Sequence, residues 1–123
     1  MGNYFQKEIE CASADQIRAW QNERLVKQVK NIYDNVPYYR TRMQNKGLEP
    51  GDIKSIDDLH KLPFITKDDL RDAYPYGLLA RPLKDCVRMQ STSGTTGRRV
   101  VAFYTQHDLD LWEDCCARAI VAA

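Results

Sequence analysis

The sequence predicts an α/β fold, or α+β for this chain taken alone, with a helix-rich N-terminal portion followed by a small β-hairpin and a helix. Two observations lead to this prediction. Apolar residues recur at helical spacing from about residue 13 to residue 35, and residues that can cap helices open several later segments. After Arg81 and Pro82 the pattern changes to two short runs rich in β-branched and aromatic residues, which favour strands.

The first helix is expected from about Ser13 to Asn35. Ser13 and Gln16 have the spacing of a capping box, in which the hydroxyl accepts from a helical N–H and the Gln side chain reaches back. Its apolar positions form one stripe: Ile17, Trp20, Leu25, Val29, Ile32 and Val36. Pro37 restricts the residue before it and should end or bend this helix.

Three shorter helices are expected next. The first starts at Pro37, carries Tyr38, Tyr39 and Met43, and is closed by Gly47, which accepts left-handed dihedral angles. Two brief helices follow, each opened by a hydroxyl residue with an aspartate three positions later. These pairs are Ser55 with Asp58 and Thr66 with Asp69, and the helices end at Pro63 and at Pro75 with Gly77.

Two strands are expected at Cys86–Gln90 and at residues 100–104, with a loop of small residues between them. Thr105 with Asp108 then opens a final helix that carries Trp112. Trp20 and Trp112 lie on apolar helical stripes, so both are expected to be buried. The last residues, 119–123, are small and apolar and carry no helix stop signal, which predicts that the chain is the front piece of a longer protein.

Composition excludes several classes of protein. The 123 residues carry 18 Lys and Arg against 17 Asp and Glu, so the net charge of +1 favours neither nucleic acid nor an anionic membrane as a partner. No apolar run approaches the roughly 18 residues of a membrane span, and the polar first ten residues do not resemble a signal peptide. A cytoplasmic protein is therefore expected.

Its four cysteines (Cys11, Cys86, Cys115 and Cys116) should be reduced, and no zinc-like spacing predicts a metal site.

The loop between the two predicted strands carries the chemistry. Seven successive small residues, Ser91 to Gly97, allow close approach of a ligand and present N–H and hydroxyl donors that suit phosphate oxygens. Arg98 and Arg99 follow, and either could add a charge-assisted bond. Neither the Walker pattern nor the Rossmann pattern fits the spacing. A flexible linker is the alternative interpretation.

The loop residues 92–97, Thr-Ser-Gly-Thr-Thr-Gly, resemble the phosphate-binding signature of the adenylate-forming acyl-CoA ligase superfamily. Two upstream segments narrow the resemblance to phenylacetate–coenzyme A ligases. These are residues 35–40 (Asn-Val-Pro-Tyr-Tyr-Arg) and the stretch 62–78 that begins Leu-Pro-Phe-Ile-Thr-Lys-Asp-Asp-Leu-Arg-Asp. The resemblance extends from about residue 14 to residue 123. It places the chain within the large adenylate-forming domain, truncated relative to the family.

The resemblance implies an ATP-dependent reaction in two steps. An arylacetate carboxylate attacks the α-phosphate of ATP, and coenzyme A then displaces AMP to give a thioester. The ATP phosphates would be bound by a set of loop residues: Thr92, Ser93, Gly94, Thr95, Thr96, Gly97 and Arg98. Related ligases usually have Lys-Pro after this loop, where this chain has Arg98 and Arg99. Mg²⁺ would assist, at a site completed outside this chain.

The same resemblance assigns residues 1–80 to a helical N-terminal subregion and residues 81–123 to the start of the AMP-binding domain. It places no catalytic residue and no metal ligand within this chain, so the chain alone is expected to be inactive. Exposed apolar surface and free strand edges are expected to favour self-association. Two alternatives stay open: a stand-alone binding or assembly module that catalyses nothing, and an adenylating enzyme whose acceptor is not coenzyme A.

Overall fold

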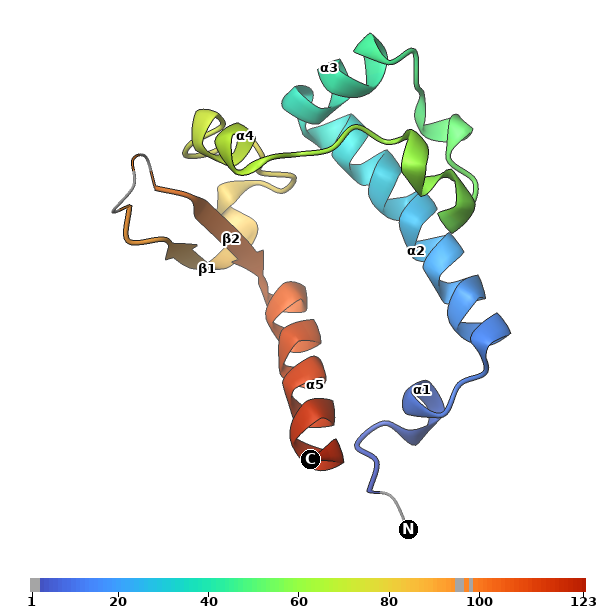
Figure 1. Ribbon diagram of the computed structural model, residues 1–123. Helices are drawn as coiled ribbons and strands as arrows, with labels where there is room; N and C mark the ends of the chain where they lie inside the picture. Colours follow the sequence, from blue (N-terminus) through green and yellow to red (C-terminus); the bar gives the residue numbers. More distant parts are fainter. Residues whose placement is uncertain (1–2, 95–96, 98) are drawn as a thin grey trace.

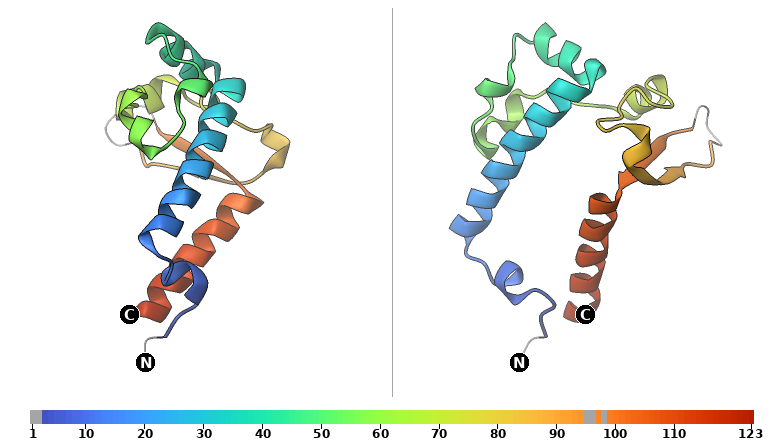
Figure 2. Two further views of the ribbon diagram at one scale, coloured as in Figure 1. Left: turned by 90° about the vertical axis from the view of Figure 1, so that its right-hand side faces the viewer. Right: turned by 180° about the vertical axis from the view of Figure 1, so that it is seen from behind.

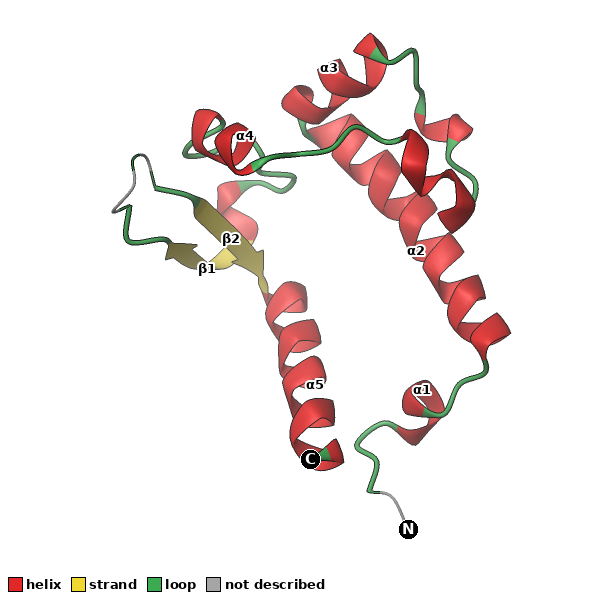
Figure 3. Ribbon diagram, viewed as in Figure 1, coloured by secondary structure: helices red, strands yellow, loops and turns green. Residues whose placement is uncertain are grey.

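The computed structural model describes residues 3–94, 97 and 99–123. Its elements are mostly helical, with one antiparallel pair of strands in the part of the chain that is described (Figures 1 and 3). Four elements form the first half of the chain: α1 (Lys7–Glu10), α2 (Ala14–Asn35), α3 (Pro37–Asn45) and the 3₁₀ helix η1 (Pro50–Asp52). Six follow: η2 (Ile56–Lys61), α4 (Lys67–Asp72), η3 (Leu83–Asp85), β1 (Cys86–Ser91), β2 (Val101–Thr105) and α5 (Gln106–Ala122). The predicted helix-rich fold with a small hairpin and a C-terminal helix is confirmed.

The two long helices, α2 and α5, form two arms of the molecule (Figure 1). The chain rises along α2, turns back through α3, and crosses to the hairpin and α5 through the segment that contains α4 and η3. The short helix α1, which the sequence did not predict, lies at the same end of the molecule as the C-terminal end of α5 (Figure 2). No helix among the described residues is long and apolar enough to cross a membrane.

Helix α2 begins where its cap predicts and ends at the residue before Val36. The Ser13 hydroxyl accepts a hydrogen bond from the Gln16 N–H, which satisfies one of the otherwise unpaired donors of the first turn. Val36 is extended, with φ −117° and ψ 93°, because the following proline disfavours the helical conformation before it. Pro37 then opens α3 at a position where no N–H is needed.

The hydrophobic core lies where α2, α3 and the segment after η1 meet. Its five buried side chains are Val29, Val36, Tyr39, Met43 and Ile53. Partly buried residues from several segments pack around them, including Leu25, Ile32, Leu48, Leu62 and Leu78. The chain turns back toward this core at Gly47, whose φ of +67° is the left-handed conformation that the sequence predicts for it.

The two brief helices have the predicted caps but differ in geometry. Ser55 and Asp58 form a reciprocal capping box, yet the helix they open is a 3₁₀ helix, Ile56–Lys61, rather than an α-helix. Thr66 and Asp69 cap α4 in the same way, and α4 ends at Asp72, before the predicted stop at Pro75. Capping signals therefore located the starts of these helices more accurately than their ends.

The strands β1 and β2 pair in antiparallel register, with Arg88 opposite Tyr104 and Met89 opposite Phe103. Because side chains alternate along a strand, these two pairs lie on opposite faces of the hairpin. On one face the Trp112 ring of α5 lies 5.8 Å from the Tyr104 ring, and the Arg88 guanidinium lies 5.4 Å above the Trp112 ring. The hairpin thus contacts α5 through one aromatic and cationic cluster.

Helix α5 contains no buried residue, although Thr105 and Asp108 form the predicted capping box at its start. Trp112 is 43% exposed, and Ile120 is 76% exposed. The expectation of a buried Trp112 is therefore wrong, and Trp20 is only partly buried. An apolar helical stripe shows which face packs but not whether the same chain supplies the surface that covers it.

Candidate functional site

The loop predicted to bind phosphate joins β1 to β2, and two hydrogen bonds link the residues at its two ends. The Thr92 N–H donates to the Val100 carbonyl at 3.0 Å, and the Val100 N–H donates to the Thr92 hydroxyl oxygen at 3.1 Å. These two bonds extend the hairpin by one position and fix the distance between the two ends of the loop. The Thr92 hydroxyl accepts in this pair, so its own O–H proton stays available to a ligand.

Both loop glycines that the sequence singles out have positive φ. Gly94 has φ +72° and Gly97 has φ +128°, conformations that side-chain-bearing residues rarely adopt. The Gly97 N–H donates to the Gly94 carbonyl at 3.3 Å, which closes a turn within the loop. The two glycines therefore set the backbone path that presents the donors of the loop.

The structure brings together four of the seven predicted phosphate-binding residues. Thr92 and Ser93 open the loop, the Gly97 N–H bonds to the Gly94 carbonyl, and all four residues except Gly94 are exposed. Thr95, Thr96 and Arg98 lie outside the described residues. Exposed hydroxyl and N–H donors on a turn of this kind can bind a phosphate oxygen without any rearrangement of a core. Phosphate binding by these residues stays a prediction.

Arg99, directly after the loop, lies against the predicted site although the sequence does not assign it there. The Arg99 side chain lies across Gly94: a Cβ atom on Gly94 would be 2.8 Å from the Arg99 Cγ and 3.5 Å from its Nε. The signal that could have singled it out is its position directly after the loop, where the side chain can fold back onto the turn.

The described residues hold neither a metal site nor a disulfide. No group of three or more His, Cys, Asp or Glu side chains among them is arranged to hold a metal ion. All four cysteines are free. The described residues therefore offer no ready-made cluster of side-chain ligands for a metal ion.

A polar junction holds α4, which precedes the hairpin, against α3. The Tyr38 hydroxyl donates to the Asp69 Oδ1 at 2.6 Å, and the Arg42 guanidinium lies 2.8 Å from the Asp69 Oδ2. The Thr66 N–H also donates to the Asp69 Oδ2, at 2.7 Å. These donors, the Tyr38 hydroxyl first and Arg42 second, hold the pKa of Asp69 far below its usual range. The junction fixes the segment that leads from the helical core to the hairpin.

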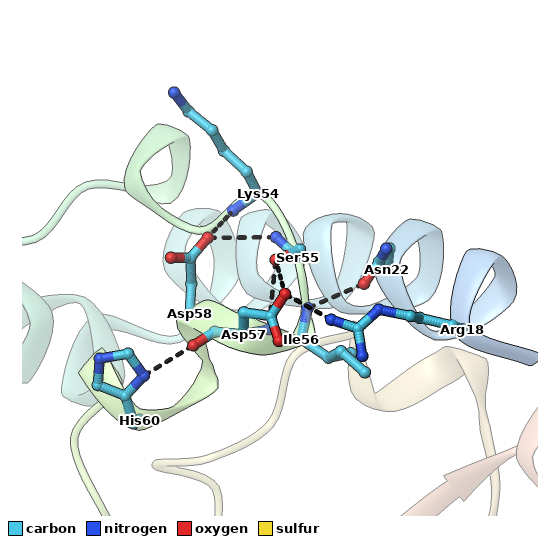
Figure 4. A network of polar contacts seen from close by, with 8 residues as sticks. All are labelled: Arg18, Asn22, Lys54, Ser55, Ile56, Asp57, Asp58 and His60. Atoms are coloured by element: carbon cyan, nitrogen blue, oxygen red, sulfur yellow. Dashed lines mark hydrogen bonds and ion pairs between the residues drawn. The ribbon is translucent and has the colours of Figure 1, made fainter. Parts of the chain in front are cut away.

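A second polar network attaches η2 to α2 (Figure 4). Arg18 forms an ion pair with Asp57, and the Asn22 side chain accepts from the Ile56 N–H at 2.9 Å. Asp58 accepts from the backbone of Lys54 and Ser55 and pairs with Lys61, contacts that lower its pKa to about 2, with Lys61 the largest cause. In this network Asp58 caps η2, and Asp57 joins η2 to α2.

These two aspartates make the fold sensitive to acid. An unfolded aspartate has a pKa of about 3.9, above the folded pKa of Asp58 and Asp69, so the unfolded chain binds protons first as the pH falls. Their contribution is fully present above about pH 5 and is lost toward pH 2. We expect the urea unfolding midpoint of this chain to fall over that interval. Asp69→Asn should flatten the pH dependence and lower the midpoint at pH 7.

The matched control is Asp85→Asn, at an exposed aspartate of η3 whose side chain forms no described hydrogen bond or ion pair. It should leave the pH dependence as it is. Equal flattening by both variants would contradict the assignment of acid sensitivity to Asp69.

No family model matches the chain, but comparison with known proteins finds relatives. It is 48% identical over 115 residues to a phenylacetate-coenzyme A ligase of Pseudomonas putida. It is 44% identical over 115 residues to the ligase of that name from Escherichia coli, and 40% identical over 119 residues to that of Thermus thermophilus. The P. putida and E. coli matches each cover 94% of this chain and 26% of the relative, and the T. thermophilus match covers 97% and 27%.

The chain thus spans about a quarter of the length of the curated relatives it matches. Among solved structures, it is similar to 2-hydroxyisobutyryl-CoA ligase in complex with 2-HIB-AMP and CoA in the thioesterification state, with a TM-score of 0.85 and 25% identity. That match covers 96% of this chain and 26% of the ligase. The same ligase in a postadenylation state, with 2-HIB-AMP, gives a TM-score of 0.78 at 22% identity, a likeness of fold. The predicted resemblance to phenylacetate–coenzyme A ligases is confirmed.

Proposed function

We propose that this chain is the N-terminal part of an ATP-dependent ligase that converts an arylacetate, such as phenylacetate, into its coenzyme A thioester. The observation that carries the proposal is 48% identity over 94% of the chain to a phenylacetate-coenzyme A ligase, in a span that includes the glycine loop. The loop geometry supports it independently, because positive φ at Gly94 and Gly97 and the hydrogen bond between them form a turn of the kind that can present donors to an anion.

The proposed reaction gives the loop a defined task. In the first step a carboxylate oxygen forms a bond to the α-phosphorus of ATP, and pyrophosphate leaves with the electron pair of the broken P–O bond. In the second step the sulfur of coenzyme A attacks the carbonyl carbon, and AMP leaves. Negative charge shifts along the phosphates in the first step, so fixed N–H and hydroxyl donors stabilise it by position alone. Among the described residues, the Thr92 hydroxyl, Ser93 and the Gly94 N–H would supply these donors, and Gly97 would shape the turn that presents them.

The division of the chain follows from the same proposal. Residues 1–80 would form a helical subregion that carries its own small core, and residues 81–123 would begin the AMP-binding domain. The burial supports this division, because every fully buried side chain among the described residues lies between Val29 and Ile53. The binding sites for the aryl group, for adenine and for Mg²⁺ would lie in the remainder of the enzyme, and the chain alone would be inactive.

The test is ATP–pyrophosphate exchange with the full-length protein that contains this chain. We expect exchange that depends on phenylacetate, and release of a phenylacetyl thioester only when coenzyme A is added. The chain expressed alone should give AMP release at background. Absence of both exchange and ATP binding in the full-length protein would favour a non-catalytic module. Exchange without thioester formation would favour an adenylating enzyme with another acceptor.

A further inference from the structure

Arg99 is held against the turn of the loop by contact with a glycine. The space that a Cβ on Gly94 would occupy is filled by the Arg99 side chain, with Cγ at 2.8 Å and Nε at 3.5 Å from that position. Two features therefore favour glycine at position 94: its φ of +72°, and the Arg99 side chain, which a larger residue would displace. The stem of Arg99 crosses the turn, which keeps its charged end at the loop.

Unlike most other described arginines, Arg99 has a guanidinium that no other described protein group binds. Arg18, Arg42 and Arg71 form ion pairs with aspartates, and Arg40 of α3 donates to two backbone carbonyls at the end of α2. Arg99 is exposed and forms no hydrogen bond, ion pair or ring contact within the part of the chain that is described. An unengaged guanidinium beside a turn of N–H and hydroxyl donors has the chemistry that recognises phosphate oxygens.

We propose that Arg99 is a phosphate-binding residue of the loop and contacts the triphosphate of ATP. The inference rests on the proposed function and deepens it, since Arg98 was the arginine assigned to phosphate by resemblance. Related ligases usually have proline at the position of Arg99, which offers neither a charge nor an N–H donor. The guanidinium can form two parallel bonds to phosphate oxygens while its stem stays packed on Gly94.

The experiment compares Arg99→Ala, Arg99→Lys and a matched control, Arg24→Ala, in the full-length protein. Arg24 is an exposed arginine of α2, far from the loop in sequence, so its removal changes the net charge equally. Two readouts are taken: equilibrium binding of ATP, and the KM for ATP with kcat in pyrophosphate exchange. Loss of one charge-assisted bond corresponds to a change of about 10- to 150-fold.

We expect Arg99→Ala to raise the Kd and KM for ATP by about 10-fold or more, with a melting temperature close to that of the parent. Arg99→Lys should recover part of the affinity, because it keeps the charge but loses the fork of donors. Added guanidinium ion at millimolar concentration should partly rescue Arg99→Ala and not the parent. A merely structural arginine would show no such rescue. Arg24→Ala should leave both ATP constants unchanged.

The outcomes separate this inference from the proposed function. Normal Kd and KM for ATP in Arg99→Ala would overturn the role of Arg99 and leave the ligase proposal in place. ATP binding by the parent that weakens in Arg99→Ala, without any exchange, would support Arg99 and overturn the ligase proposal. A parent protein that binds no ATP would overturn both.

Discussion

Replacing Gly94 with valine is expected to reduce kcat/KM for ATP in the full-length protein by at least about 100-fold. Gly94 has φ +72°, where a β-branched residue is strained by about 1–3 kcal/mol. Its Cβ would also lie 2.8 Å from the Arg99 Cγ and 3.3 Å from the Gly97 carbonyl oxygen. The turn and Arg99 must therefore move together, and the loss of a single charge-assisted bond already corresponds to about 10- to 150-fold. Pyrophosphate exchange at varied ATP concentration measures the effect.

Three glycines of the same chain serve as comparisons. Gly97→Val should also depress exchange, but less. The φ of +128° strains a valine there, yet its Cβ would meet no other described atom within 4 Å. Gly47→Val places the same strain, at φ +67°, in the turn after α3, so it should lower stability and leave the KM for ATP unchanged. Gly51 has open space and no positive φ, so Gly51→Val should change neither property. Normal exchange by Gly94→Val would refute the assignment of this loop to ATP.

Truncating Met43 to alanine is expected to destabilise the chain by about 2–5 kcal/mol. The Met43 side chain is completely buried at the centre of the core, in contact with a cluster that has only four other buried members. A domain of this size has a total stability of about 5–15 kcal/mol, so a large part of it depends on this one side chain. The melting temperature should fall on the order of 10 °C, as measured by circular dichroism.

Met89→Ala is the matched control, because it removes the same atoms from a position that is 64% exposed. It should change the free energy of unfolding by less than about 0.5 kcal/mol. A similar loss from both variants would mean that the chain alone does not hold Met43 in a packed core.

Local signals in the sequence predicted much of this fold. Helix caps at Ser13, Ser55, Thr66 and Thr105 all form, because a capping hydroxyl bonds to a backbone N–H only two or three residues away. The hairpin was also predicted, from β-branched and aromatic residues on either side of a glycine-containing loop. Positive φ at Gly47, Gly94 and Gly97 follows from the same local reasoning.

Contacts between distant residues were not predictable in the same way. Nothing in the sequence shows that Tyr38 and Arg42 converge on Asp69, since the first two lie on α3 and Asp69 lies on α4. The exposure of Trp112 was missed because periodicity gives the apolar face of a helix and not the surface that covers it. The position of Arg99 over Gly94 depends on the path of the loop backbone, which residue types alone leave open.

The short sequence span of the core has a consequence for synthesis on the ribosome. All five buried side chains of the described residues lie between Val29 and Ile53, so the contacts that join them are local along the chain. Local contacts form quickly, and chains emerge N-terminus first at about 5–20 residues per second. The residues that complete this core are therefore synthesised within about 1–5 s of one another. The helical part can collapse around Met43 before the hairpin and α5 have left the exit tunnel, and so offer a folded surface against which later segments assemble.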